Sequence, residues 1–404
     1  MRALTWQGPQ DVRVETVPDP VIQQPTDAIV RVTSTAICGS DLHLYSVLGA
    51  FLHPGDVLGH EFMGVVEEVG PEAAASGLSV GDRVVVPFNI SCGHCWMCSR
   101  GLFAQCETTQ NRDQGKGASL FGYTDLYGAV PGGQAEYVRV PQAQFGPVTL
   151  PEHGADERYL YLSDILPTAW QGVQWAQVPE GGTLAVFGLG PVGQLAVRTA
   201  LRLGRVGRVI GVDLVPERLA AARAWGAEVV DLNQVDGKGR KPEEVGRAIA
   251  ELTDGRGADG ALDAVGMEAH GNPVAERVIT AAGRLPGVIG KPAIENAGID
   301  RLAALHGCIE SVRRGGTVSI SGVYGGMVDP MPMMTMFDKG IAMRMGQCHV
   351  KQWTPELFDV VTQDEDVLGL EDLATHRVGL EDAPRMYEVF QKKQDNCLKV
   401  VMTP

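Results

Sequence analysis

Four closely spaced cysteines constrain this chain more than any other feature. Cys92, Cys95, Cys98 and Cys106 follow the spacing Cys-x2-Cys-x2-Cys-x7-Cys. Residues 91–107 carry too few apolar side chains to order themselves by packing, whereas four thiolates on one loop suit tetrahedral zinc in a closed structural site. We therefore expect a metal ion to form the core of this segment.

Two other uses of these cysteines compete with zinc. Disulfides need an oxidising compartment, and the first residues, MRALTWQGPQDVRVE, lack the apolar stretch of a secretory signal. An iron–sulfur cluster shares the x2, x2 spacing, but bacterial ferredoxin runs continue with x3 and proline, whereas x7 and Glu107 follow here. Spacing and context favour structural zinc.

Length and charge set the wider frame. The 404 residues are 44% hydrophobic, which is enough for two domains, and no apolar run approaches the roughly 20 residues that span a bilayer. The net charge of -15 argues against nucleic acid as a partner. We expect a cytoplasmic protein with reduced thiols, because the remaining cysteines are scattered: Cys38, Cys308, Cys348 and Cys397.

The rhythm of the chain changes near residue 167. Before it, short β-branched runs alternate with Gly and Pro turns, which predicts a mostly β domain with strands at 28–32, 62–69, 83–86 and 135–140. From Gly182 apolar strands alternate with helices, which predicts a parallel sheet. Its strands are expected at 183–187, 209–212, 228–230, 260–263 and 317–321, and its helices at 191–203, 216–225, 242–253 and 301–313. After Gly325 we expect this rhythm to be lost.

A glycine-rich turn lies between the first of these strands and its helix. Its residues are Gly188, Gly190, Pro191, Val192 and Gly193, and Asp213 ends the next strand 20 residues beyond Gly193. Such a turn lets a pyrophosphate approach the helix N-terminus, and the carboxylate accepts hydrogen bonds from the ribose. Asp213 favours NAD over NADP. Arg218 lies nearby, and its positive charge leaves the preference between NAD and NADP open. Alternatively, its acidic neighbours neutralise that charge.

A second group of metal-type residues lies in the β part. The turns Cys38-Gly39-Ser40-Asp41-Leu42-His43 and Gly59-His60-Glu61 combine a thiol, imidazoles, carboxylates and a hydroxyl. Each residue alone has an ordinary structural explanation. Together with a dinucleotide site they indicate a catalytic metal.

Taken together, these motifs resemble the zinc-dependent medium-chain alcohol dehydrogenase family over essentially the whole chain. The matching strings are CGSDLH, GHEFMGVVEEVG, GDRVVVP, the cysteine lobe, GGQAEYVRVP, GLGPVG and GVD. The resemblance implies an α/β protein with a GroES-like catalytic domain at 1–167, a Rossmann doubly wound domain at 168–335 and a C-terminal completion of the catalytic domain at 336–404. It also implies two zinc ions per subunit, NAD, and a homodimer or homotetramer.

The resemblance assigns Cys38 and His60 to catalytic zinc and leaves a third ligand to be found. No cysteine lies between Cys106 and Cys308, so a carboxylate has to serve. The string Leu162-Ser163-Asp164-Ile165-Leu166-Pro167-Thr168 resembles glutathione-independent formaldehyde dehydrogenases, in which its aspartate is the ligand. Asp164 is therefore our candidate, against the nearby Glu152, Asp156 and Glu157. Glu61 is expected behind the metal or as a transient ligand.

The implied reaction moves a hydride between an alcohol or hydrated aldehyde and NAD. Zinc lowers the pKa of the bound hydroxyl. The resemblance assigns Ser40 and His43 to a proton relay, and Asp41 either orients His60 or bonds local amides.

The substrate is the open point. In the formaldehyde dehydrogenase branch an insertion covers the adenine end of NAD, and the broken segment 266–300 fits either such a retaining cover or a plain surface insertion. Retained NAD would allow aldehyde dismutation. The alternatives are a sorbitol or threonine dehydrogenase-type enzyme with exchangeable NAD, and a non-catalytic NAD-binding sensor.

Overall fold

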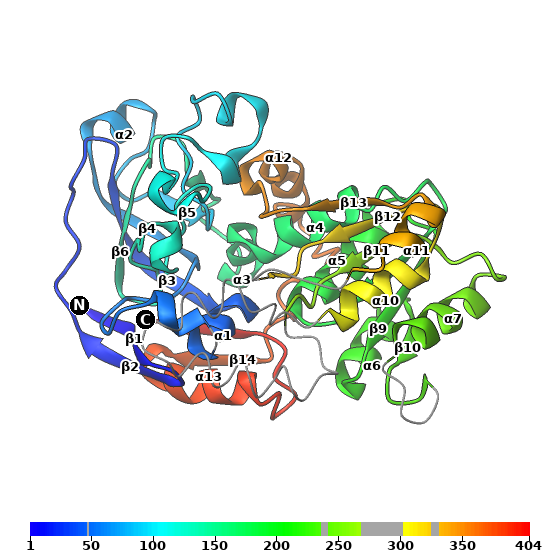
Figure 1. The fold of residues 1–404 in the computed structure, drawn as a ribbon. Coiled ribbons are helices and arrows are strands. Elements are labelled where there is room, and N and C mark those ends of the chain that lie inside the picture. The colour runs from blue at the N-terminus through cyan, green and yellow to red at the C-terminus, as the bar shows by residue number, and fades with distance from the viewer. Residues whose placement is uncertain (47, 236–240, 268–301, 325–330) are drawn as a thin grey trace. The chain divides into compact units, whose positions relative to one another are not determined.

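The chain folds into two compact units. The computed structural model describes residues 1–404 except 47, 236–240, 268–301 and 325–330 (Figure 1). Unit 1 comprises Met1–Pro167 and Cys348–Pro404, and unit 2 comprises Thr168–Gln347. Among the described residues, no helix is long and apolar enough to cross a membrane.

Unit 1 is built on a seven-stranded sheet of order β14-β15-β3-β4-β5-β7, with β6 also paired to β3, and a separate β1-β2 hairpin. The strands are β1 (Arg2–Gly8), β2 (Asp11–Thr16), β3 (Ala28–Ile37), β4 (Glu61–Val69), β5 (Arg83–Val86), β6 (Tyr137–Val140), β7 (Val148–Thr149), β14 (His376–Gly379) and β15 (Val400–Thr403). The helices are α1 (Gly39–Ser46), α2 (Pro71–Ala75), α3 (Asp156–Leu160), α12 (Val350–Val361) and α13 (Ala383–Gln391).

The core of unit 1 follows from the side-chain alternation of its central strands. Val30 and Val32 of β3 lie on one face with Phe62 and Val66 of β4, and all four are buried in one apolar cluster. The β-branched and aromatic residues suit such a pleated, buried surface. The mostly β prediction for this part is confirmed.

The C-terminal residues complete this sheet. Strand β15 runs antiparallel to β3, with Val400 opposite Ile37, so the red end of the chain lies beside the blue start in Figure 1. This segment joins unit 1 at Cys348, whereas the sequence analysis placed the boundary at 335/336. Residues 336–347 belong to unit 2 because they contain a strand of its sheet.

Unit 2 is a parallel six-stranded sheet of order β10-β9-β8-β11-β12-β13. Its strands are β8 (Thr183–Phe187), β9 (Arg208–Asp213), β10 (Glu228–Asp231), β11 (Ala258–Asp263), β12 (Val312–Ile320) and β13 (Ala342–Met345). Its helices are α5 (Pro191–Arg202), α6 (Pro216–Ala224), α7 (Pro242–Leu252), α10 (Ala303–Ser311) and α11 (Met333–Lys339), and α4 (Ile165–Trp175) leads into it. The strand order reverses between β8 and β11, which is where doubly wound sheets bind ligands. The Rossmann prediction is confirmed.

One sequence expectation was wrong. The α/β rhythm continues after Gly325, because α11 leads into β13 and β13 pairs in parallel with β12. The sequence did not predict strand β13, which has only four residues, Ala-Met-Arg-Met, at the edge of the sheet. Three of them are exposed, so the strand has no buried apolar pattern.

Candidate functional site

Three of the expected ligands meet inside unit 1. Cys38 follows β3, His60 precedes β4, and Asp164 ends a short 3-10 turn, Tyr161–Ser163. Asp164 Oδ2 lies 3.5 Å from Cys38 Sγ and 3.3 Å from His60 Nε2. All three residues are buried, and with Glu61 their donor atoms lie within 4.8 Å of one another.

These separations fit tetrahedral zinc. Bonds of about 2.0 Å to oxygen and nitrogen and about 2.3 Å to sulfur, at tetrahedral angles, require O–N and O–S separations of about 3.3 and 3.5 Å. A thiolate, an imidazole and a carboxylate are also the donors that zinc takes in catalytic sites with one open position. The geometry therefore matches the ion on both distance and chemistry.

The rival carboxylates are engaged elsewhere. Asp156 accepts hydrogen bonds from the Thr33 and Ser34 hydroxyls and pairs with Arg83. Glu157 pairs with Arg377. Among the described residues, Asp164 belongs to a converging group of metal-type side chains, whereas Asp156, Glu157 and Glu152 belong to none.

Burial and the neighbouring carboxylates together favour the protonated forms of Cys38 and His60. The pKa of the Cys38 thiol is raised to about 11 by burial and by the charges of Asp164 and Glu61. Burial lowers the pKa of His60, but Asp41 and Asp164 outweigh it and hold that pKa well above its ordinary value. Zinc binding therefore has to displace protons.

We predict that zinc affinity at this cluster falls as the pH falls. Neutral pH lies below the pKa values of both Cys38 and His60, so both groups carry protons. For each proton that zinc has to displace, zinc affinity falls about 10-fold when the pH falls by one unit. Competition with a chelator between pH 6 and 8 measures this. A pH-independent affinity would contradict the proton-holding cluster.

Asp41 links two of the ligands. Its Oδ2 accepts a hydrogen bond of 2.9 Å from the Cys38 N–H, and its Oδ1 lies 3.0 Å from His60 Nδ1. A carboxylate at Nδ1 leaves Nε2 as the metal-binding nitrogen. The expected orienting contact is therefore present, together with one to the Cys38 backbone.

Helix α1 also carries the two expected relay residues. Ser40 Oγ lies 3.2 Å from His60 Nε2, so the hydroxyl faces the ligand atoms. His43 is buried one turn later on the same helix. Residues three apart share a helix face.

Glu61 has a partner that the sequence analysis missed. Lys399 Nζ donates to both Glu61 carboxylate oxygens, at 2.6 and 2.7 Å, and to the Ile37 carbonyl at 3.0 Å. Neither side chain of the Glu61–Lys399 pair is exposed. The available signal was a lone lysine in the apolar run Cys-Leu-Lys-Val-Val-Met. This pair engages both carboxylate oxygens of Glu61 beside the three ligands.

We predict that breaking this pair from one side is costly. Lys399→Met leaves a buried carboxylate without its cation and should lower the free energy of unfolding by about 3–5 kcal/mol. The double variant Glu61→Gln with Lys399→Met should recover most of that loss, as measured by urea unfolding of the zinc-loaded protein. Equal losses in the single and double variants would contradict a buried ion pair.

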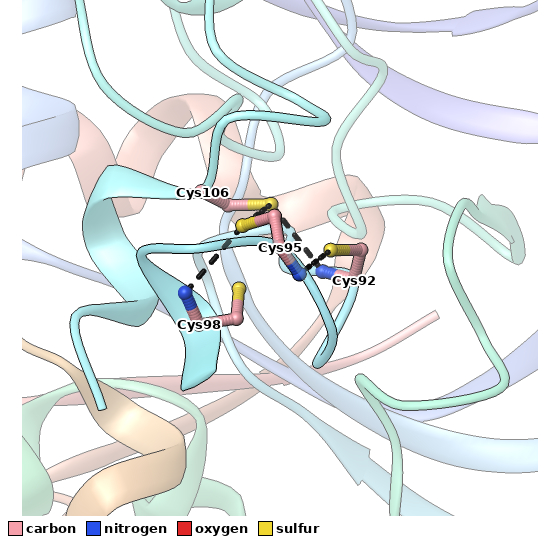
Figure 2. Close-up of side chains that lie close together, drawn as sticks. All are labelled: Cys92, Cys95, Cys98 and Cys106. Carbon is pink, nitrogen blue, oxygen red and sulfur yellow. Dashed lines mark hydrogen bonds between the residues drawn. The ribbon is translucent and has the colours of Figure 1, made fainter. Parts of the chain in front are cut away.

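The second metal-type group is the cysteine quartet (Figure 2). Its four sulfur atoms lie within 4.8 Å of one another, all four cysteines are free of disulfides, and Cys95 Sγ lies 3.9 Å from Cys106 Sγ. Zinc bonds of about 2.3 Å to four sulfurs require separations of about 3.8 Å. These separations fit a single zinc ion, and none of the four cysteines forms a disulfide, which agrees with the expected structural zinc site.

Backbone N–H groups support the thiolates of this lobe. Cys95 Sγ accepts from the N–H groups of Cys98 and Glu107, both at 3.4 Å, and Cys92 Sγ accepts from the N–H of Cys95 at 3.3 Å. Burial raises the pKa of Cys95, but these N–H groups outweigh it and lower that pKa to about 6. Such charge stabilisation favours metal binding.

In unit 2 the glycine turn has the geometry that a pyrophosphate needs. Gly188 has a φ of +84°, Gly190 caps α5, and Pro191 and Val192 open its first turn. A Cβ on Gly193 would lie 1.8 Å from the Gly188 carbonyl oxygen, so only glycine permits this packing.

Asp213 ends β9 and is committed to the same turn. Its Oδ2 accepts from the Leu189 N–H at 2.7 Å, and its Oδ1 accepts from the N–H groups of Leu214 and Val215. The Arg218 guanidinium approaches Gly190, at 3.8 Å from the place of an added Cβ. The carboxylate thus shapes the glycine turn.

Family models and relatives agree with this geometry. The model described as alcohol dehydrogenase GroES-like domain matches residues 24–151, and the model described as zinc-binding dehydrogenase matches residues 191–290. An uncharacterised zinc-type alcohol dehydrogenase-like protein of Bacillus subtilis, AdhB, is 38% identical over all of both chains. The chain belongs to the zinc-type medium-chain alcohol dehydrogenase family. Its cofactor set is two zinc sites and an NAD site in the Rossmann unit.

Other relatives have more specific names. A glutathione-independent formaldehyde dehydrogenase of Pseudomonas aeruginosa is 34% identical, over 96% of this chain and 94% of that protein. A formaldehyde dismutase of Pseudomonas putida is 33% identical, over 97% and 95%. The solved alcohol dehydrogenase TADH from Thermus sp. ATN1 is 33% identical with a TM-score of 0.81, covering 100% of this chain and 99% of that one.

Proposed function

We propose that this family member moves a hydride between NAD and a small alcohol or hydrated aldehyde of the formaldehyde type, and dismutates aldehyde on retained NAD. The observation that carries the proposal is Asp164, whose carboxylate closes the ligand set within the Leu-Ser-Asp-Ile string. The names of the Pseudomonas relatives support the substrate class. Residues 268–301, which hold most of the expected NAD cover, lie outside the described part of the chain.

The side chains of unit 1 supply the proton path. Zinc, when bound, acts as a Lewis acid that lowers the pKa of a substrate hydroxyl. Ser40 Oγ, at 3.2 Å from His60 Nε2, faces the ligand atoms and would accept the substrate proton while releasing its own. His43, one turn further along α1, passes that proton onward.

The charges of the ligands and the contacts around them stabilise the arrangement of the zinc site. Cys38 and Asp164 bring two negative charges, which match a dication, and Asp41 holds the imidazole of His60. Glu61 stays beside the ligands because Lys399 binds both of its oxygens. A transient ligand role for Glu61 needs that pair to open.

Dismutation balances without free cofactor. One hydrated formaldehyde gives a hydride to NAD and leaves as formate. The resulting NADH then gives the hydride to a second formaldehyde, which takes up a proton and leaves as methanol. Two aldehydes and one water thus yield one acid and one alcohol, and NAD is regenerated.

We predict that protein purified without added cofactor carries two zinc ions and near-stoichiometric NAD(H), and turns formaldehyde into equal amounts of methanol and formate without added NAD. Metal analysis, release of nucleotide on denaturation and product quantification measure this. Two zinc ions without bound NAD, and activity only on secondary alcohols or polyols with added NAD, would favour the sorbitol or threonine dehydrogenase-type alternative. Two zinc ions and NAD without any turnover would favour the sensor.

We predict that Asp213→Gly lowers kcat/KM for NAD about 10-fold or more and leaves the value for NADP comparatively unharmed. The Leu189 N–H also loses its acceptor, and that loss affects both cofactors alike. The ratio of the two values, measured with exogenous cofactor on enzyme stripped of nucleotide, therefore isolates the ribose contact. An unchanged ratio would disprove that contact.

We also propose a homo-oligomer, a dimer or tetramer. Apolar side chains are exposed together on α11 and the adjoining edge strand β13: Met333, Met334, Phe337 and Met345 are 59–87% exposed. Strand β13 ends the sheet on this side among the described residues. A second copy that covers this surface would bury both the apolar side chains and the strand edge.

A further inference from the structure

A buried series of polar contacts leads from the C-terminal helix α13 to the ligand His60. The Tyr387 hydroxyl donates to Gln134 Oε1 at 2.8 Å, and Gln134 Nε2 lies 3.3 Å from Asp41 Oδ2 as a donor. Asp41 Oδ1 then lies 3.0 Å from His60 Nδ1. The first three residues are 0% exposed and His60 is 3% exposed, so water does not compete for these contacts.

Hydrogen bonds and packing fix the position of Gln134 between Tyr387 and Asp41. Its Nε2 also donates to the Ala36 carbonyl at 3.0 Å, and its N–H donates to the Leu58 carbonyl at 3.0 Å. Its side chain packs against the residue before His60: a Cβ on Gly59, which has a φ of +96°, would lie 2.3 Å from Gln134 Cγ. Only glycine fits there, so Gln134 also fixes the backbone that delivers His60.

Asp41 contacts two of the zinc ligands, His60 and Cys38. Besides the contact with His60, its Oδ2 accepts from the Cys38 N–H at 2.9 Å. Gln134 therefore supports the one carboxylate that orients both the imidazole and the thiolate-bearing backbone. Outer contacts of this kind set the ring orientation and basicity of a ligating histidine.

We propose that Tyr387 and Gln134 are positioning residues for the catalytic zinc, so that docking of the C-terminal segment and zinc affinity are coupled. The inference rests on the zinc site of the proposed reaction and not on its substrate. Without the Tyr387 hydroxyl, the buried Gln134 Oε1 loses that donor, and the amide that donates to Asp41 loses one of the contacts that hold it in place. Because coupling is reciprocal, zinc in turn holds the segment in place.

The test uses Tyr387→Phe in the full-length zinc-loaded protein, with Tyr45→Phe as its matched control. The Tyr45 ring packs against Tyr387 at 5.5 Å between centroids, so the control removes a hydroxyl from the same aromatic pair outside the chain of contacts. Chelator competition measures zinc affinity at the catalytic cluster. Cobalt substitution reports the ligand geometry through its visible absorption bands.

Tyr387→Phe should weaken zinc binding on the order of 10-fold and shift the cobalt bands, while the structural zinc is retained. Tyr45→Phe should leave both readouts unchanged. Gln134→Met, which keeps the size and removes the three side-chain polar contacts to Tyr387, Asp41 and Ala36, should give a larger loss than Tyr387→Phe. Equal zinc affinity and identical cobalt spectra for all three variants and the parent would overturn the proposal.

Neither readout uses substrate or NAD. A protein that fails to turn over formaldehyde but shows the cobalt shift would refute the proposed substrate and leave the positioning role standing. A formaldehyde-active enzyme whose variants show unshifted cobalt bands would refute the positioning role and leave the proposed substrate standing.

Discussion

The catalytic cluster depends on how charge is balanced inside unit 1. Four residues bring acidic groups into a buried space: Cys38, Asp41, Glu61 and Asp164. Lys399 forms an ion pair with one of them, Glu61. An uncompensated charge in such a place costs several kcal/mol. Lys399 matches Glu61, and a zinc dication matches the Cys38 thiolate and Asp164. Zinc bound at this cluster would therefore add to the stability of the interior.

Sheet register places these groups. Strands β3 and β4 run antiparallel with Ala36 opposite Glu61, so the end of β3 carries Cys38 past the turn that presents His60. Strand β15 pairs with β3 from the other side, with Val400 opposite Ile37, and this brings the neighbouring Lys399 to Glu61. The chain thus uses its last strand to neutralise a residue beside its first metal ligands.

The local motifs were predictable from the sequence, because each keeps its chemistry within a few residues. The cysteine quartet, the Cys38 and His60 turns and the Gly188–Gly193 turn all belong to this kind, and the repeated strand-to-helix rhythm predicted the Rossmann sheet. Asp164 needed the family resemblance, because four carboxylates between 152 and 164 look alike in sequence.

The rest could not be predicted because it depends on pairing across long stretches of chain. Lys399 contacts Glu61 and Tyr387 contacts Gln134 over separations of 338 and 253 residues. The apolar run around Lys399 signals only that this lysine is buried, and no local pattern identifies the partner of either residue. The edge strand β13 was missed for a different reason. Its side chains are mostly exposed, so burial leaves no periodicity in the sequence.

The most direct test of this account is a crystal structure with anomalous scattering recorded at the zinc edge. The account predicts two peaks per chain. One lies among the four sulfurs of the quartet, and the other lies about 2.0–2.3 Å from Cys38 Sγ, His60 Nε2 and an Asp164 oxygen. A peak in the quartet alone, or a second zinc that Glu61 binds while Asp164 turns away, would contradict it.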